Sequence, residues 1–225
     1  MLILAVDTTT PSGSVALLEG EALLGEAGIE SRATPSARLL RTIDFLLGAH
    51  GRDVRDIDAF AVAAGPGSFT GIRIGVGAVK ALAFASGKTV APISTLLALA
   101  EKLSGEGEGL VCPLLDAKKE EIYAGLFEAR GAGLAEIIPQ GAYIPDAFFA
   151  RLPPGRAIAF AGSGLAVCRE KLLTAVGDRA RFPRRSSFIA AEVARLGAGI
   201  ISGGGGVDAA ALEPIYYRRS QAEEK

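Results

Sequence analysis

Short apolar runs and longer amphipathic segments alternate along the chain, and together they predict an α/β protein. The opening run, Leu2–Val6, is apolar at every position, which is typical of a strand covered on both faces. Similar runs predict further strands at Ser14–Leu18, Glu21–Ile29, Ala59–Ala64, Thr89–Ile93, Leu110–Leu115, Glu121–Glu128, Leu134–Ile138 and Ala157–Ala161. Apolar residues at helical spacing predict helices at Ala37–Leu47, Gly71–Ser86, Leu96–Leu103, Pro145–Arg151, from the Gly162-Ser163-Gly164 turn to Val176, and Phe188–Ile201.

The segment Ala61–Gly77, AVAAGPGSFTGIRIGVG, links a predicted strand to the helix that follows it. Its first glycines flank Pro66 and permit backbone angles that other residues avoid. Ser68 and Thr70 are residue types that cap helix N-termini, where backbone N–H groups lack partners. A turn of this kind can bind an anion, or it can be a tight, capped connection, and local physics favours neither.

The helix at Gly71–Ser86 is apolar on nearly every side. Arg73 and Lys80 are its only charged residues, and they lie seven positions apart on one face. A ridge of mainly small residues runs along it and lets another backbone approach closely. The ridge consists of Gly71, Gly75, Ala78 and Leu82. A helix of this composition has to be buried, either in the core of its own chain or against a partner.

The first strand runs into Asp7, Thr8, Thr9 and Thr10, and a Pro-Ser-Gly turn follows before the second strand. The hydroxyl and backbone donors of such a turn are one way to hold phosphate. The Asp7 carboxylate would then orient a hydrated Mg²⁺. Asp7 is equally able to accept hydrogen bonds from its own turn. These four residues are the candidate phosphate-binding set, with that alternative open.

A Gly- and Glu-rich break, Ser104–Gly109, predicts a domain boundary. We expect a first domain over residues 1–104, completed by residues 186–225, and a smaller α/β domain over residues 105–185. After the break, the order strand, Asp116, turn, strand repeats the opening pattern and indicates a duplicated architecture. The second turn has lysines and glutamates in place of glycine and threonine, so it makes a poor phosphate cradle.

The chain has 225 residues, of which 49% are hydrophobic and 22% charged, so it is able to bury a substantial core. Its net charge of −1 predicts no general attraction to nucleic acid, so another chain would have to supply most of the phosphate contacts to any RNA. Cys112 and Cys168 lie in apolar segments and are expected to be buried thiols. The single histidine, His50, cannot form a multi-histidine site, so we predict no metal site.

The amino terminus turns polar at Asp7 and has no basic leader, so no signal peptide is expected. No run approaches the roughly 18 uncharged apolar residues of a membrane span. We therefore expect a cytoplasmic protein with no membrane partner.

Five segments resemble the bacterial TsaB (YeaZ) family in their order and spacing, and GPGSFTG followed by IRIG is the most specific. The segments are ILAVDTTTPSGSVAL (3–17), AAGPGSFTGIRIGVG (63–77), PISTLLALA (92–100), LLDAKKEEIYAGLF (114–127) and EPIYYR (213–218). The resemblance implies the actin/sugar-kinase/Hsp70-like (ASKHA, ribonuclease H-like) fold, with two duplicated α/β domains.

The resemblance also implies a part in forming N6-threonylcarbamoyladenosine at adenosine 37 of tRNAs that read ANN codons. Members of the family are regarded as non-catalytic scaffolds, so we expect no catalytic residue in this chain. They dimerise with a catalytic paralogue, TsaD, and help to recruit an ATPase, TsaE. Without these partners they form homodimers. No cofactor is firmly implied for the chain itself, and binding of ATP or ADP with Mg²⁺ is left open for the complex.

The family uses faces of the first domain that contain the helices matching Ala37–Leu47 and Gly71–Ser86. The predicted interface residues are Leu39, Ile43, Leu46, Gly71, Ile72, Ile74, Gly75, Val76 and Val79. Many members carry His-Ser or His-Thr before the first of these helices, whereas Pro35-Ser36 stands here. No role of that histidine is therefore transferred to this chain.

Two other functions are weighed against the scaffold. An autonomous ATP-Mg²⁺-dependent ATPase or phosphotransferase of the same fold would use Asp7 and its threonines, with Asp116 as the carboxylate of the second turn. A peptidase, an activity proposed for the family, would need Ser68 to meet His50. The scaffold is favoured because the sequence contains no metal or nucleophile constellation.

Overall fold

The computed structural model describes residues 1–28, 35–105, 109–131 and 133–217. The chain divides into two compact units. Unit 1 consists of Met1–Ala98 and Ser187–Tyr216, and unit 2 consists of Leu99–Ser186 and Tyr217. The division falls within helix α3 (Thr95–Ser104).

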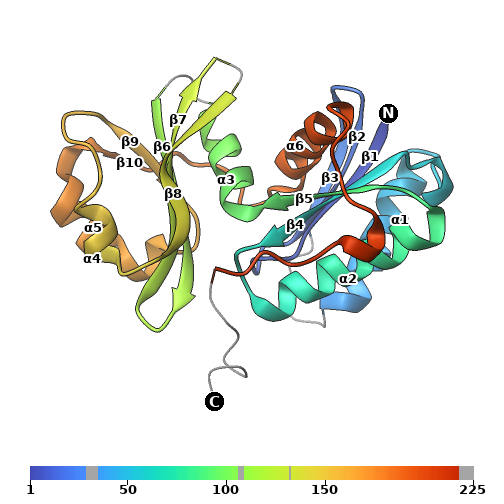
Figure 1. Ribbon diagram of the computed structural model, residues 1–225, viewed down its shortest axis with the longest axis horizontal. Helices are drawn as coiled ribbons and strands as arrows, with labels where there is room; N and C mark the ends of the chain where they lie inside the picture. Colours follow the sequence, from blue (N-terminus) through green and yellow to red (C-terminus); the bar gives the residue numbers. More distant parts are fainter. Residues whose placement is uncertain (29–34, 106–108, 132, 218–225) are drawn as a thin grey trace. The chain divides into compact units, whose positions relative to one another are not determined.

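Unit 1 is built on a mixed sheet with the strand order β3-β2-β1-β4-β5 (Figure 1). The strands are β1 (Leu2–Asp7), β2 (Ser14–Glu19), β3 (Ala22–Gly28), β4 (Ala59–Gly65) and β5 (Val90–Ser94). β1 pairs antiparallel with β2 and parallel with β4, which in turn pairs parallel with β5. Every residue of β1 is buried, as its continuous apolar run predicts for a strand covered on both faces.

Helices cover both faces of this sheet (Figure 1). They are α1 (Pro35–Ala49), α2 (Phe69–Ser86) and α6 (Ala190–Ser202), with short 3-10 turns η1 (Val54–Asp56) and η3 (Ala209–Ala211) in the connections. α1 and α2 pack on the face that carries Leu4, Val6 and Phe60. α6 packs on the opposite face, where Gly197 meets Ala61. Successive side chains along each strand point to opposite faces of the sheet, so they pack alternately under α1 and α2 or under α6.

The amino-terminal end of α6 is held by side chains from the hairpin β2–β3. The helix has no capping side chain of its own. Instead, the Ser14 hydroxyl accepts a hydrogen bond from the Ala190 N–H (3.0 Å), and the Glu26 carboxylate accepts one from the Ala191 N–H (3.1 Å). N–H groups at a helix start have no partner within the helix. Distant residues therefore complete the helix, and α6 belongs to unit 1.

A strap, Val207–Tyr216, runs from the end of α6 across unit 1 towards the start of α2 (Figure 1). It begins with a bridge between Val207 and β5. Further along, the Lys80 ammonium of α2 donates hydrogen bonds to the carbonyl oxygens of Ala210 (2.9 Å) and Leu212 (3.2 Å). One of the two charges of α2 is therefore used to hold the strap.

Unit 2 repeats the strand arrangement of unit 1, with the order β8-β7-β6-β9-β10. Its strands are β6 (Gly109–Lys118), β7 (Glu121–Arg130), β8 (Gly133–Tyr143), β9 (Ile158–Ala161) and β10 (Ala180–Arg181), and its helical elements are α4 (Pro145–Phe149), α5 (Leu165–Val176) and the 3-10 turn η2 (Gly177–Arg179). β6 is antiparallel to β7 and parallel to β9, just as β1 is to β2 and β4. The match confirms the predicted duplication.

The elements depart from the sequence prediction in a few places. α2 begins at Phe69 rather than Gly71, so Thr70 lies inside the helix. Ser68 is the N-cap, and its hydroxyl accepts a hydrogen bond from the Gly71 N–H (3.3 Å). β10 lies in a segment predicted to be a connection, because two residues are too few to produce a pattern. The two cysteines are free and buried, as predicted.

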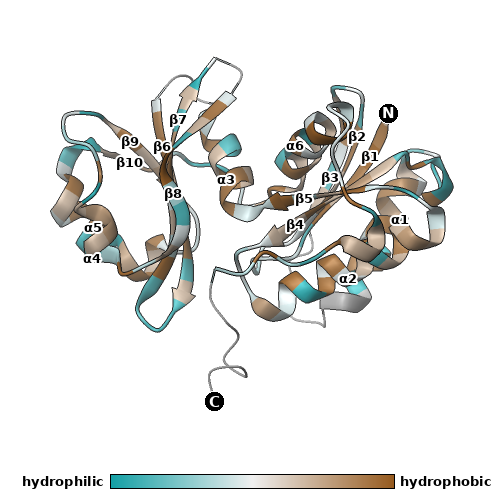
Figure 2. Cartoon of the chain, viewed as in Figure 1, coloured by the Kyte–Doolittle hydropathy of each residue, from teal (hydrophilic) through white to brown (hydrophobic). Residues whose placement is uncertain are grey.

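Within the described residues, α2 is the one helix that is long and apolar enough to cross a membrane, judged by length and composition alone. In unit 1 it lies on the sheet with one side buried. The buried residues are Gly71, Ile72, Gly75, Val76, Val79 and Ala83. Figure 2 shows β1 and β5 in the hydrophobic colour, whereas α2 carries both kinds of residue.

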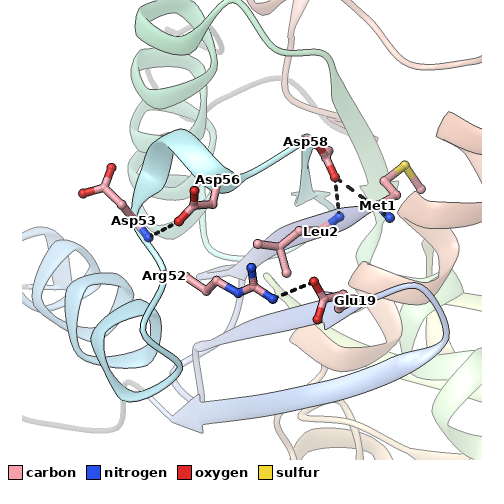
Figure 3. Close-up of polar contacts among 7 residues, drawn as sticks. All are labelled: Met1, Leu2, Glu19, Arg52, Asp53, Asp56 and Asp58. Atoms are coloured by element: carbon pink, nitrogen blue, oxygen red, sulfur yellow. Dashed lines mark hydrogen bonds and ion pairs between the residues drawn. The ribbon is translucent and has the colours of Figure 1, made fainter.

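Polar contacts fix the amino-terminal edge of the same sheet (Figure 3). The Asp58 carboxylate accepts a hydrogen bond from the Leu2 N–H (2.7 Å) and lies 3.9 Å from the Met1 ammonium. The Arg52 guanidinium pairs with Glu19 at 2.8 Å. These side chains are partly exposed, so each ion pair contributes little to stability. They join the starts of β1 and β4 and the end of β2.

The close packing of α6 on β4 is testable with two glycines of one helix. A Cβ atom at Gly197 would lie 2.6 Å from the Cβ of Ala61, whereas one at Gly199 would meet no atom within 4 Å. We expect Gly197→Ala to lower the free energy of unfolding by about 1–3 kcal/mol. Gly199→Ala, the control, should raise it by about 0.5–1 kcal/mol, because alanine is the better helix former. Urea denaturation measures both, and equal effects would contradict this packing.

Candidate functional site

Two turns interlock at the carboxyl edge of the sheet in unit 1. Because β1 and β4 are parallel neighbours, the turn Asp7–Thr10 lies beside the turn that leads into α2. The Ser68 N–H donates a hydrogen bond to the Thr9 carbonyl (2.7 Å), and the Thr8 hydroxyl donates one to the Gly71 carbonyl (2.7 Å). We refer to this pair of turns as the clasp. It fixes the first turn of α2 on the end of β1.

Glycine makes the clasp possible. A Cβ atom at Gly67 would collide with the backbone of Thr9. One at Gly71 would collide with the Thr8 carbonyl oxygen, and one at Gly75 with the Thr8 hydroxyl. The ridge of small residues predicted on α2 therefore does receive another backbone at its amino-terminal end, and that backbone belongs to the same unit.

The strap closes the other side of this turn. The Ile215 N–H donates a hydrogen bond to the Ala64 carbonyl at the end of β4 (2.7 Å). Gly65 has a φ of +124°, and a Cβ atom there would collide with the Ile215 carbonyl oxygen. Glycine is thus required at Gly65 for two reasons, a backbone angle that other residues rarely adopt and the approach of the strap.

Two of the three threonine hydroxyls predicted to bind phosphate, those of Thr8 and Thr9, are engaged within the clasp. The Thr9 N–H and hydroxyl both donate to Asp7 Oδ1, at 2.8 and 2.6 Å. The Thr8 hydroxyl is bound to α2, and both threonines are buried. Of the two interpretations open in the sequence, the structure matches the one in which Asp7 accepts hydrogen bonds from its own turn.

Asp7 nevertheless keeps one oxygen without a partner. Its side chain is fully buried, and Oδ2 forms no hydrogen bond with any described residue, as is true of the hydroxyls of Thr10 and Thr95. Burial raises the pKa of Asp7 to about 6. The hydrogen bonds from Thr9 lower this pKa, and the charge of Glu26 raises it.

These residues do not fit a magnesium-bound nucleotide in the arrangement described. Mg²⁺ prefers octahedral oxygen ligands and phosphate needs free donors, whereas the buried side-chain atoms of Asp7–Thr10 leave only one carboxylate oxygen and the Thr10 hydroxyl unpaired within the described residues. Of the four candidate phosphate-binding residues, Asp7 and Thr10 each keep an atom free, and Thr8 and Thr9 do not.

The corresponding turn of unit 2 has a different chemistry on the same architecture. The Gly164 N–H donates to the Leu114 carbonyl (3.0 Å), as Ser68 does to Thr9 in unit 1. The Lys118 ammonium lies 2.6 Å from the Asp116 carboxylate. Burial raises the pKa of Asp116, but the hydrogen bonds and charge of Lys118 together lower it by more, so the net pKa is below its ordinary value. The Asp116 carboxylate, which a metal would need as a ligand, is therefore paired with a lysine.

The residues predicted for the partner interface lie on the inner sides of α1 and α2. Ile74 is half-buried, and the other eight are buried in unit 1. The eight are Leu39, Ile43, Leu46, Gly71, Ile72, Gly75, Val76 and Val79. The six that have side chains pack into the core of unit 1, because burial on a unit's own core satisfies the apolar stripe of a helix without a second chain.

Large apolar side chains remain exposed on the other sides of the same helices. Phe84 on α2 is 76% exposed, Phe45 on α1 is 69% exposed and Leu40 on α1 is 54% exposed. We refer to the exposed sides of α1 and α2 as the outer face. Single exposed apolar residues are ordinary, but several of this size on two contacting helices are a feature of contact surfaces. The predicted partner faces include Phe84 but not Phe45, although the position of Phe45 opposite the apolar stripe of α1 identifies it as a surface residue.

Ser68 and His50 are not brought together. Ser68 lies in the clasp at the carboxyl edge of the sheet, where its hydroxyl caps α2. His50 is exposed after the end of α1, and its Nε2 would lie 3.1 Å from a Cβ atom at Gly25 in β3. This placement offers no nucleophile and base pair within the described residues.

Comparison with known proteins decides the family. Residues 31–200 match the family described as "TsaD: tRNA N6-adenosine threonylcarbamoyltransferase". The TsaB protein of Bacillus subtilis is 28% identical over 100% of this chain and 97% of its own length. A Pseudomonas aeruginosa structure described as similar to the peptidase YEAZ superposes with a TM-score of 0.82, at 27% identity, over 96% of this chain and 99% of that one. The chain belongs to this family, as one of its TsaB (YeaZ) members.

Other TsaB and TsaD proteins match parts of the chain. The TsaB protein of Haemophilus influenzae is 39% identical over 55% of this chain and 52% of its own length. A tRNA N6-adenosine threonylcarbamoyltransferase of Erythrobacter litoralis is 35% identical over 42% of this chain and 25% of its own. A TsaB chain therefore shares part of its sequence with the transferase itself.

Structures outside the family show the fold. The hexokinase of the ROK type from Thermus thermophilus has a TM-score of 0.52 at 13% identity, over 89% of this chain and 100% of that one. The likeness confirms the ASKHA architecture that the sequence predicted for a TsaB member. The departure from other members at Pro35-Ser36 lies at the start of α1, where the side chains are outside the described residues.

The buried carboxylate of Asp7 predicts a pH-dependent stability. Its folded pKa of about 6 is above the ordinary value of 3.8, so the folded protein holds an extra proton between these values. The contribution of Asp7 to the free energy of unfolding is therefore complete below about pH 4 and is lost as the pH rises through 6, by up to about 3 kcal/mol.

Asp7→Asn cannot ionise and should remove this loss. Between pH 4 and 7.5, urea denaturation should show the wild type losing stability relative to Asp7→Asn. Asp44→Asn, which removes an exposed carboxylate from α1, is the control and should follow the wild type. Parallel curves for the wild type and Asp7→Asn would contradict the raised pKa.

Proposed function

We propose that this chain is the non-catalytic subunit that supports threonylcarbamoyl transfer to adenosine 37 of tRNAs reading ANN codons. It takes part in the biosynthesis of tRNA threonylcarbamoyladenosine, the process named for its TsaB relatives. The observation that supports the scaffold role is a contrast within unit 1. The Thr8 and Thr9 hydroxyls of the phosphate-like turn are engaged inside the clasp, while the outer face presents Phe45 and Phe84 to solvent.

The partner on the outer face is a TsaD-type chain. The match to the TsaD family and the identity with TsaD relatives mean that the two chains share a fold. Chains that share a fold can meet through corresponding faces related by a pseudo-twofold axis. A standard interface of roughly 1,600 Å² buries enough apolar area, at about 25 cal/mol per Å², to exceed an association cost of about 4–15 kcal/mol.

The scaffold acts by shape rather than by chemistry. Docking on the outer face holds the catalytic chain in its active arrangement, and the pair then recruits a TsaE-type ATPase. In the absence of the TsaD-type chain, two copies associate through the same helices. Contact with tRNA is indirect, and the reaction takes place in the cytoplasm.

The alternative is an autonomous ATPase or phosphotransferase that uses ATP and Mg²⁺. Its one supporting feature is the unpaired Oδ2 atom of Asp7. Against it stand the engaged hydroxyls of Thr8 and Thr9 and the Lys118 ammonium on Asp116. Calorimetry with ATP and Mg²⁺ on the isolated chain separates the two functions, because tight binding with turnover would favour the enzyme.

The interface is tested most sharply at exposed positions. Phe84→Glu should lower the affinity for the TsaD-type protein of the same organism by at least about 100-fold, because a charge would be buried at a contact centre. The fold should be unchanged, since the Phe84 side chain lies in solvent. Val76 would be a poor site for this test, because an arginine there would enter the core of unit 1.

Val167→Glu is the matched control. Val167 is also exposed and apolar, but it lies on α5 in unit 2. We expect Val167→Glu to bind as the wild type does, with circular dichroism confirming that both variants are folded. Undiminished binding by both Phe84→Glu and Phe45→Glu would contradict the proposed interface.

A further inference from the structure

One charged side chain lies on the outer face of α2, near the amino-terminal end of the helix. The exposed positions of this helix are Thr70, Arg73, Gly77, Ala81, Phe84 and Ala85. Arg73 is the only one of them that carries a charge. The other charge of the helix, Lys80, is half-buried and bound to the strap. The surface around Arg73 on α2 is therefore uncharged.

Arg73 is held by stacking and not by hydrogen bonds. Its guanidinium lies 3.7 Å from the centroid of the Phe69 ring, a cation–π contact. The Phe69 ring in turn lies 5.3 Å from that of Tyr216, at an interplanar angle of 31°. No hydrogen bond or ion pair joins Arg73 to any other described residue. The stack thus orients a guanidinium that is open to solvent water.

Covering the outer face would remove that water. A guanidinium buried without a partner is costly, whereas a carboxylate facing it forms charge-assisted, frequently bidentate hydrogen bonds. We propose that Arg73 is the specificity-determining residue of the outer face, and that the partner places a carboxylate against it within an apolar surface. This inference rests on the proposed function and identifies the chemistry by which the partner is selected.

Charge balance favours a different chain over a second copy as the occupant. α1 and α2 together contain one carboxylate, Asp44, while Arg41 and Arg73 are both exposed on them. A contact between two copies is isologous, with the same face on both sides. With Arg41 and Arg73 from each copy, such a contact would place four guanidinium groups against only two Asp44 carboxylates. A different chain that presents carboxylates to this face would have no such excess, so the self-contact is the weaker one.

The test measures binding of Arg73 variants to the TsaD-type protein of the same organism by calorimetry. We expect Arg73→Glu to weaken binding at least 100-fold, Arg73→Leu about 10- to 100-fold, and Arg73→Lys less than either. Added KCl should weaken the wild type but have little effect on Arg73→Leu, because only the wild type forms the ion pair. Arg55→Glu, at a side chain that is 95% exposed near the start of β4, is the charge-matched control and should bind normally.

The outcomes separate this inference from the proposed function. Wild-type binding by Arg73→Glu, when Phe84→Glu has lost binding, would overturn the role of Arg73 and leave the interface standing. No binding by the wild type would overturn both. Recovery of Arg73→Glu binding by a lysine at one partner carboxylate would support the ion pair. Light scattering tests the second copy. If Arg73→Glu breaks a self-dimer and the double variant Arg73→Glu/Asp44→Arg restores it, then Arg73 pairs with Asp44 of a second copy, which would overturn the choice of partner.

Discussion

The clasp between Asp7–Thr10 and the start of α2 is the contact on which the rest of unit 1 depends. Two backbones approach so closely there that only glycine fits at Gly67 and Gly71. The approach uses the Thr8 and Thr9 hydroxyls as internal donors. A turn with the composition of a phosphate-binding loop therefore has a structural role, because it holds β1 and α2 together.

The position of α2 follows from the clasp and the strap together. The clasp fixes the amino end of the helix, and the Lys80 ammonium ties a later turn to the strap. With both points fixed, one side of the helix faces the core and the other faces solvent. The strap also places Tyr216 against Phe69, which in turn supports Arg73. Residues far apart in the sequence therefore shape the surface proposed to meet a partner.

The two units share one architecture but differ in whether the carboxylate near the end of the first strand has a charged partner. Both have a strand, a turn and a glycine-containing helix start in close contact. In unit 1 Asp7 keeps an unpaired oxygen, and its burial raises its pKa. In unit 2 Asp116 is neutralised by Lys118, and its pKa is lowered. This asymmetry suits a protein that supports a reaction by contact rather than by carrying it out.

The sequence by itself determined the strands, the helices, the Ser68 cap and the duplicated order, because each leaves a local or repeated pattern. It also identified the family through GPGSFTG. Only the tertiary structure decided which side of α2 is buried, since a helix that is apolar nearly all round carries no periodic signal for its orientation. The capping of α6 by Glu26 and the two-residue strand β10 were equally hidden, because they depend on chain segments that meet only after folding.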